Sequence, residues 1–145
     1  MRLTILNQAI ANCVTDRCPC SRYMHYCIAF RGKKILATGS NCVCKLSHRY
    51  SFDDSLHAEP SCLAKLKDQK KSFDILVIRM NVSGTRLLSS RPCRSCSIWL
   101  NLGFFPLKRV YFSTDDGGIS SLDKKDLIKG SMCSKTFLHH DDNEE

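Results

Sequence analysis

Residues 73–80 have the sequence FDILVIRM, a nearly continuous apolar run between two polar segments. A run of this length and composition is typical of a strand that is buried on both faces of a sheet. Such a sheet needs helices on both sides, and crossover connections supply them. The run therefore predicts an α/β fold, in which the neighbouring segments either pair with this strand or cover it.

Three segments have the composition of covering helices. The apolar positions of residues 3–14 recur every three or four residues, as in an amphipathic helix. They are Leu3, Leu6, Ile10 and Val14. Residues 57–69 are rich in helix formers, with a proline where a first turn tolerates one, and residues 93–102 form a third candidate that Gly103 would end.

Four further strands are predicted beside the central one. Residues 26–31 and 34–38 flank a Gly-Lys turn and should form a hairpin, and residues 108–112 form another strand. The Asp-Gly-Gly turn at 116–118 predicts a hairpin into a fifth strand, although a loop into residues 124–128 also fits. The alternation of helices and strands predicts a three-layer α/β/α sandwich with a mixed sheet of about five strands.

The size of the chain matches one domain. Its 145 residues can bury a single core, and 43% hydrophobic and 25% charged residues are typical of soluble proteins. We expect one domain over residues 1–138 and a short, acidic, disordered tail over residues 139–145. No apolar run is long enough to span a bilayer and no secretory signal is present. The ten cysteines are therefore expected in a reducing, intracellular and cytoplasmic setting, without a membrane partner.

The net charge of +8 favours an anionic partner, such as a nucleotide phosphate or a nucleic acid. Much of this surplus lies in lysine pairs that are far apart in the sequence. They are Lys33 and Lys34, Lys70 and Lys71, and Lys124 and Lys125. A solvated basic surface explains such scattered pairs equally well.

Two short motifs each open a predicted helix. One is His57-Ala58-Glu59, and the other runs from Pro92 through Cys93 to Cys96. Because the two cysteines are three residues apart, their sulfurs point to one face of the first turn, where the helix dipole stabilises thiolates. Two thiolates and one imidazole are the three ligands typical of a catalytic zinc ion that keeps one position open for water. The motifs therefore predict one catalytic Zn²⁺ held by His57, Cys93 and Cys96.

Glu59 supplies the proton chemistry that such a metal needs. Zinc lowers the pKa of a bound water, and a carboxylate beside it can pass the proton to a ring nitrogen and a leaving amine. The only other glutamates of the chain are Glu144 and Glu145 at its end. A closed, structural zinc site with Cys62 as fourth ligand is the alternative, but such a site has no use for Glu59.

The two motifs resemble the paired signatures of the zinc-dependent cytidine and deoxycytidylate deaminase superfamily. The resemblance covers about residues 3–119 and includes residues 21–25, 39–41 and 109–112. It implies a cytidine deaminase-like fold and a single zinc ion with Glu59 as the proton shuttle. It also implies substrate contacts through the Asn41 side chain and through the backbone around four positions in two segments. These contacts are expected at Asn41, Ala58, Ser90, Arg91 and Pro92.

The resemblance predicts hydrolytic deamination of cytidine, deoxycytidine or dCMP to the uracil form, with release of ammonia. An antiparallel fifth strand is similar to members that act on small pyrimidines, and a parallel one to deoxycytidylate, tRNA or polynucleotide enzymes. The alternatives are a tRNA or nucleic-acid deaminase of adenosine or cytosine, and a non-catalytic zinc-binding module. A nucleic-acid partner therefore stays open, and relatives of this kind suggest a homo-oligomer.

Two further clusters bear on these alternatives. Cys13, Cys18 and Cys20 could hold a second metal, although buried or spare thiols explain them better. A polynucleotide deaminase needs cations and aromatic rings in a groove beside the metal. The candidates for that groove are Tyr23, Tyr26, Arg31, Arg49, Tyr50, Arg91 and Arg94.

Overall fold

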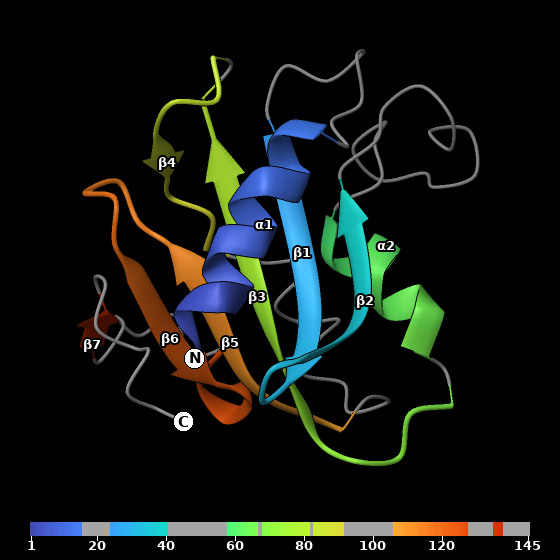
Figure 1. Ribbon diagram of the computed structural model, residues 1–145. Helices are drawn as coiled ribbons and strands as arrows, with labels where there is room; N and C mark the ends of the chain where they lie inside the picture. Colours follow the sequence, from blue (N-terminus) through green and yellow to red (C-terminus); the bar gives the residue numbers. More distant parts are fainter. Residues whose placement is uncertain are drawn as a thin grey trace, which may run out of the picture.

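The computed structural model describes seven parts of the chain. They are residues 1–15, 24–40, 58–66, 68–81, 83–91, 106–127 and 135–137. The strands within these parts are β1 (Met24–Arg31), β2 (Lys34–Ser40), β3 (Phe73–Met80), β4 (Leu87–Leu88), β5 (Leu107–Ser113), β6 (Ile119–Asp123) and β7 (Lys135–Phe137). They form one sheet in the order β2-β1-β3-β5-β6-β7, with the short β4 paired to β3. Figure 1 shows β3 in the middle of this sheet.

β3 is the central strand that its apolar sequence predicts. It is antiparallel to β1 and parallel to β5, so the sheet is mixed. Its buried side chains alternate between the two faces, which is why the sequence run is nearly continuous. The expected hairpin of β1 and β2 is present, with Gly32 at the left-handed φ of 60° in its turn. These predictions are confirmed.

The fifth strand is antiparallel. β6 pairs with β5 in a tight hairpin, and Gly117 in its turn has a φ of 84° that favours glycine. The competing expectation of a loop into residues 124–128 is wrong, because Lys124–Asp126 form a short 3-10 helix, η2, after β6 has ended. The expected number of about five strands describes the long ones, to which β4 and β7 add two and three residues.

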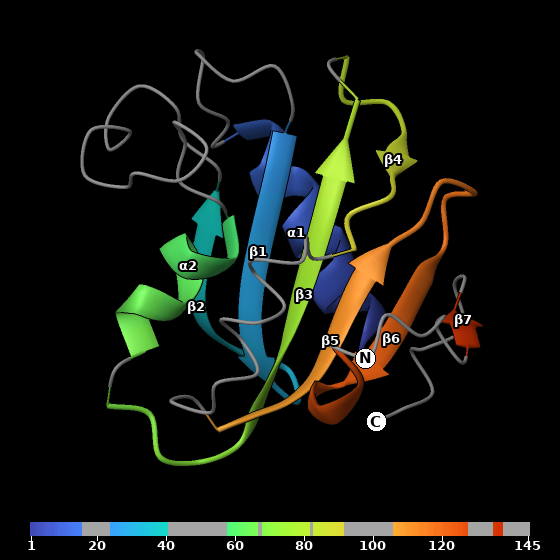
Figure 2. The same cartoon turned by 180° about the vertical axis from the view of Figure 1, so that it is seen from behind.

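Helices cover both faces of the sheet, as Figures 1 and 2 show from opposite sides. α1 (Leu3–Thr15) packs on one face, against a core that includes Tyr26, Ile28 and Ile78. α2 (Ala58–Leu63) packs on the other, against a core that includes Cys27 and Val77. The three-layer α/β/α sandwich is therefore confirmed. The predicted third helix, residues 93–102, lies outside the described residues.

The predicted span of the first helix is confirmed, whereas its buried face and the end of the second helix need correction. α1 buries Ile5, Leu6, Ala9 and Cys13, whereas Val14 is 46% exposed, so the buried face is rotated from the predicted one. α2 ends at Leu63 and continues only as the 3-10 helix η1 (Ala64–Leu66), well before the expected end at residue 69. The polar chain after η1 turns towards β3 instead. No helix of the described parts is long and apolar enough to cross a bilayer.

Candidate active site

Those predicted site residues that open α2, Ala58 and Glu59, lie with Ser90 towards one edge of the sheet. β1 is antiparallel to both β2 and β3, and β5 is parallel to β3, so β2, β3 and β5 all end at the same edge. We call it the carboxyl edge. α2 begins beside the end of β2, and Ser90 is bound to the last residue of β5. In open α/β sheets this edge is where ligands commonly bind.

α2 lies unusually close to β2, and Gly39 makes this contact possible. A Cβ atom at Gly39 would lie 2.8 Å from the carbonyl carbon of Ser61 and 2.9 Å from Cα of Cys62. These are backbone atoms, which cannot turn away as a flexible side chain can. The helix is also tied to the strand by Lys65 Nζ, which donates to the Thr38 carbonyl at 2.6 Å. The placement of Glu59 in the first turn of α2 thus depends on Gly39.

Glu59 is a buried carboxylate. Its side chain is 6% exposed, and the preceding Ala58 is fully buried in the core between α2 and the sheet. Acidic side chains are almost never buried to this degree unless they have partners or a chemical role. The burial of Glu59 therefore agrees with a role in handling protons and argues against a role in solubility.

A pair of buried serines fixes the segment that leads to the second motif. Ser90 Oγ donates to the Val77 carbonyl at 2.6 Å and accepts from the Ser113 N–H at 2.8 Å. Ser113 Oγ lies 2.6 Å from the Leu88 carbonyl and 2.8 Å from Ser90 Oγ, and it accepts from the Arg79 N–H at 3.2 Å. Both hydroxyls join the ends of β3 and β5, so the chain leaves the sheet at Ser90 in a fixed direction.

The turn between β5 and β6 adds a second anchor. Asp115 Oδ1 accepts from the Ser89 N–H at 2.8 Å, so residues 89 and 90 are both held. The next carboxylate, Asp116, accepts from the Thr114 hydroxyl and from the Gly118 N–H. The Thr114 hydrogen bond, followed by the Gly118 one, lowers the pKa of Asp116. The turn is therefore held by its own hydrogen bonds while it supports the candidate site.

Several predicted site residues cannot be placed. His57, Cys93 and Cys96 lie outside the described residues, as do Asn41 and Pro92. Within the described parts, no group of three His, Cys, Asp or Glu side chains could hold a metal ion. The zinc prediction therefore rests on the donor types of the motifs, one nitrogen and two sulfurs, which suit zinc.

Two described neighbours of those ligands are tied to the same layer of the core. Ala58, which follows His57, belongs to the core cluster that also contains Val77, and the Val77 carbonyl binds Ser90 Oγ. The Ser90 N–H donates to the Ser113 carbonyl at 2.9 Å, so a contact of the Ser90 backbone with a base would have to use its carbonyl oxygen.

Two of the residues expected to line a groove for a polynucleotide lie elsewhere in the structure. Tyr26 is fully packed in the core under α1, and Arg31 lies at the opposite edge of the sheet, where it binds residues 69–72. Neither side chain can line a groove beside the candidate site, so this part of the expectation is wrong. Tyr23, Arg49, Tyr50 and Arg94 lie outside the described residues.

The described cysteines belong to the core. Cys62 is fully buried, and its Sγ lies 3.5 Å from the Ala37 carbonyl on β2. Cys13 and Cys27 are buried as free thiols. Burial raises the pKa of Cys13 to about 12, so it stays a protonated thiol, which is a poor metal ligand. The explanation of Cys13 as a buried thiol is favoured over a second metal site. Cys18 and Cys20 lie outside the described residues.

Comparison with known proteins supports the fold. No protein-family model matches the sequence, and no curated protein matches it. Among solved structures, the chain is similar to the apo form of a dCMP deaminase from the cyanophage S-TIM5, with a TM-score of 0.52 and 20% sequence identity over 89% of this chain and 93% of the other. The same phage enzyme in complex with dCMP and dUMP gives a TM-score of 0.51 at the same identity and coverage. The chain has the fold of a dCMP deaminase. The expectation of a cytidine deaminase-like fold is thereby confirmed.

Proposed function

We propose that this protein is a zinc-dependent deaminase of cytosine nucleosides or nucleotides. The observation that carries the proposal is Glu59. It is the only glutamate before the last two residues of the chain, it stands two residues after a candidate zinc ligand, and it is 6% exposed. A buried carboxylate at this place in a deaminase fold has a direct chemical use.

The residues divide the chemistry between them. His57, Cys93 and Cys96 would hold the zinc ion. When bound, zinc supplies an acidified water at neutral pH. Glu59 takes the proton of that water, delivers it to the ring nitrogen of the base and returns a proton to the leaving amine. Water and a cytosine are consumed, and a uracil and ammonia are produced, so atoms and charges balance without a further reactant.

Burial of Glu59 supports this assignment physically. A carboxylate away from bulk water exchanges its proton with the groups that it contacts. The two serines at the end of β3 and β5 add rigidity, because a donor or ligand that is misplaced by about 1 Å can cost a hundredfold in rate. Asn41, Ala58, Ser90, Arg91 and Pro92 remain the proposed substrate contacts.

The direction of β6 and the similar solved structures both bear on the substrate, and they point to different small cytosine compounds. The antiparallel β6 is similar to members that act on small pyrimidines, whereas a parallel strand is expected of deoxycytidylate enzymes. The solved structures to which the chain is similar are of a dCMP deaminase, one of them holding dCMP and dUMP. They agree on the cytosine base. We therefore propose a cytosine monomer as substrate, with dCMP first among the candidates.

The experiment is a substrate panel with zinc-loaded protein. Ammonia release is measured with cytidine, deoxycytidine, CMP and dCMP, and zinc content is measured in parallel. Glu59→Gln should keep about one zinc per chain and lose at least a thousandfold in kcat, because only the proton carrier is removed. Asp68→Asn makes the same chemical change at an exposed carboxylate and should keep full activity.

The outcomes separate the alternatives. Turnover of adenosine in tRNA, with every cytosine monomer refused, would replace the proposal by the polynucleotide alternative. Zinc bound without turnover of any substrate would favour a structural module. If Glu59→Gln stays active, Glu59 is not the proton carrier of the reaction.

A further inference from the structure

The three lysine pairs that are scattered along the sequence meet at one edge of the folded sheet. This is the amino edge, where β3 and β5 begin, opposite to the carboxyl edge of the candidate site. Lys33 lies in the turn that follows β1 and Lys34 begins β2, and β1 ends beside the start of β3, with Phe30 paired to Asp74. Lys70 and Lys71 lie just before β3, separated from it by Ser72.

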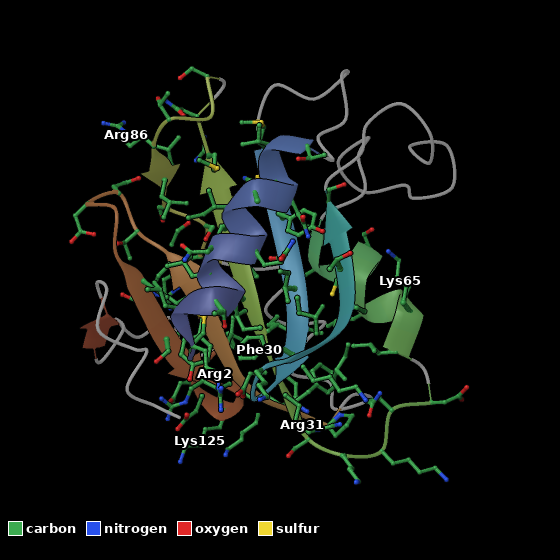
Figure 3. All side chains as sticks on the ribbon, viewed as in Figure 1. Arg2, Phe30, Arg31, Lys65, Arg86 and Lys125 are labelled. Atoms are coloured by element: carbon green, nitrogen blue, oxygen red, sulfur yellow. The ribbon has the colours of Figure 1, made fainter. Side chains whose placement is uncertain are left out.

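The remaining pair joins the same edge through β6. Arg109 near the start of β5 is paired with Asp123 at the end of β6, and Lys124 and Lys125 follow directly. Figure 3 shows Arg2, Arg31 and Lys125 at this end of the sheet and Arg86 at the other. We call the whole set the basic edge. It consists of Arg2, Arg31, Lys33, Lys34, Lys70, Lys71, Lys108, Arg109, Lys124 and Lys125.

Hydrogen bonds hold the basic edge in place. Arg31 Nε donates to the Ser72 carbonyl at 3.0 Å, and its Nη2 donates to Gln69 Oε1 at 2.8 Å and to the Lys71 carbonyl at 3.2 Å. The loop that carries Lys70 and Lys71 is thereby fastened to the end of β1, two residues before Lys33. The lysines are therefore presented from ordered backbone.

The edge also contains a groove of about 590 Å³. Its lining residues are Lys108, Arg109, Asp123, Lys124 and Lys125. The Arg109 guanidinium is paired with Asp123 at 3.0 Å, which positions it within the groove. The three lysines add to this charge, so the groove has a positive balance that suits an anion.

Among the described residues, positive charge is concentrated here. The ten cations of the basic edge are accompanied by four aspartates, Asp68, Asp74, Asp123 and Asp126, which leaves a surplus of six, since ten minus four is six. Like charges gathered on one side of a domain repel one another and oppose folding. Binding of a polyanionic partner would relieve the repulsion among these cations.

Exposed apolar and aromatic side chains indicate which kind of polyanion a basic surface binds. Binding to a membrane surface needs apolar side chains beside the cations, and binding to single strands needs aromatic rings for stacking. Within the described parts, the exposed large hydrophobic residues are Val14, on the last turn of α1, and Ile35, which follows Lys34 at the basic edge. One exposed apolar side chain beside ten cations is too little apolar surface for binding to a membrane. The five aromatic residues whose side chains are described are all buried. They are Tyr26, Phe30, Phe73, Tyr111 and Phe112.

Contacts with a phosphate backbone need cations alone. We propose that the basic edge binds duplex nucleic acid through its phosphates, without reading its sequence, at a surface separate from the candidate active site. The inference rests on the topology and charge of the sheet and does not depend on the proposed deaminase activity.

The test is fluorescence anisotropy with a labelled 20-base-pair DNA duplex, titrated with the full-length protein at several salt concentrations. Three double variants each remove one lysine pair: Lys33→Gln with Lys34→Gln, Lys70→Gln with Lys71→Gln, and Lys124→Gln with Lys125→Gln. The control double variant, Lys65→Gln with Arg86→Gln, removes the same charge away from the basic edge.

We expect each edge variant to weaken binding about tenfold or more and to make the slope of log K against log salt shallower by about 2. The control variant and Glu59→Gln should bind like the unchanged protein, so loss of catalysis and loss of duplex binding can be told apart. Circular dichroism of each variant verifies the fold.

Four outcomes would overturn the proposal. They are absence of duplex binding at 50 mM salt, equal weakening by edge and control variants, tighter binding of a single strand than of the duplex, and binding of phosphatidylserine vesicles without binding of the duplex.

Discussion

Ser113→Ala should strongly destabilise the protein, although it removes a single oxygen atom. The Ser113 side chain is fully buried, and its hydroxyl binds the Leu88 carbonyl, Ser90 Oγ and the Arg79 N–H. After the substitution, the Leu88 carbonyl and the Arg79 N–H each lose a buried partner, at about 1–3 kcal/mol each. We therefore expect the free energy of unfolding to fall by about 2–6 kcal/mol.

The measurement is urea unfolding followed by far-UV circular dichroism, with the m-value checked to be unchanged. Ser83→Ala is the matched control, because Ser83 is exposed and its hydroxyl forms a hydrogen bond with the exposed Thr85 hydroxyl. It should change the free energy of unfolding by less than about 0.5 kcal/mol. Because the same hydroxyl fixes the segment before Cys93, Ser113→Ala should also release zinc faster to a chelator.

Equal urea midpoints for Ser113→Ala and the unchanged protein would refute this reasoning. They would mean that water or a shift of β4 supplies new hydrogen-bond partners to the Leu88 carbonyl and the Arg79 N–H. A large loss of stability with unchanged zinc release would keep the hydrogen-bond argument and reject the link between Ser113 and the metal site.

Three further predictions follow from the described geometry. Gly39→Ala should lower the free energy of unfolding by about 1–3 kcal/mol, measured with urea, and reduce activity, because the new Cβ forces α2 away from β2. Cys13 should resist iodoacetamide at pH 8 in the folded protein and react after unfolding, as mapped by mass spectrometry, because its pKa is about 12. Burial raises the pKa of Asp74, against the opposing effect of Lys108 and Arg109, so the folded state binds its proton more tightly than the unfolded state does. The unchanged protein should therefore lose stability relative to Asp74→Asn as the pH rises above 3.8, the ordinary pKa of an aspartate. Thermal melts of both proteins from pH 3 to pH 7 should show a growing difference between their melting temperatures. A melting-temperature difference that stays constant over this range would contradict the prediction.

The central sheet could be predicted because each long strand carries its own signal. β3 is buried on both faces, so its sequence is apolar throughout, and the turns at Gly32 and Gly117 need the left-handed backbone that glycine favours. The short strands carry no such signal, although the turn residues Ser83 and Gly84 predict a short extended return within residues 81–90, where β4 lies. β4 has two residues, too few for any periodic pattern, and it exists only because β3 offers it partners.

The supports of the candidate site were missed for a similar reason. The contact of Gly39 with Ser61 and Cys62 joins segments that lie more than twenty residues apart, and glycine after a strand resembles an ordinary turn signal. Ser113 looks like a polar residue at the end of a strand, and only the folded sheet shows that it is buried beside Ser90. The chemistry of the motifs is local, whereas their alignment depends on tertiary contacts.

The length of β3 sets the distance between the basic edge and the carboxyl edge. Its eight residues, at about 3.3 Å each, separate the basic edge from the carboxyl edge by about 26 Å. This distance exceeds the width of a DNA double helix, so a duplex docked on the lysines leaves the opposite edge open to a small molecule. Duplex and nucleotide should therefore occupy one protein molecule at the same time, and added DNA should leave the KM for the nucleotide unchanged.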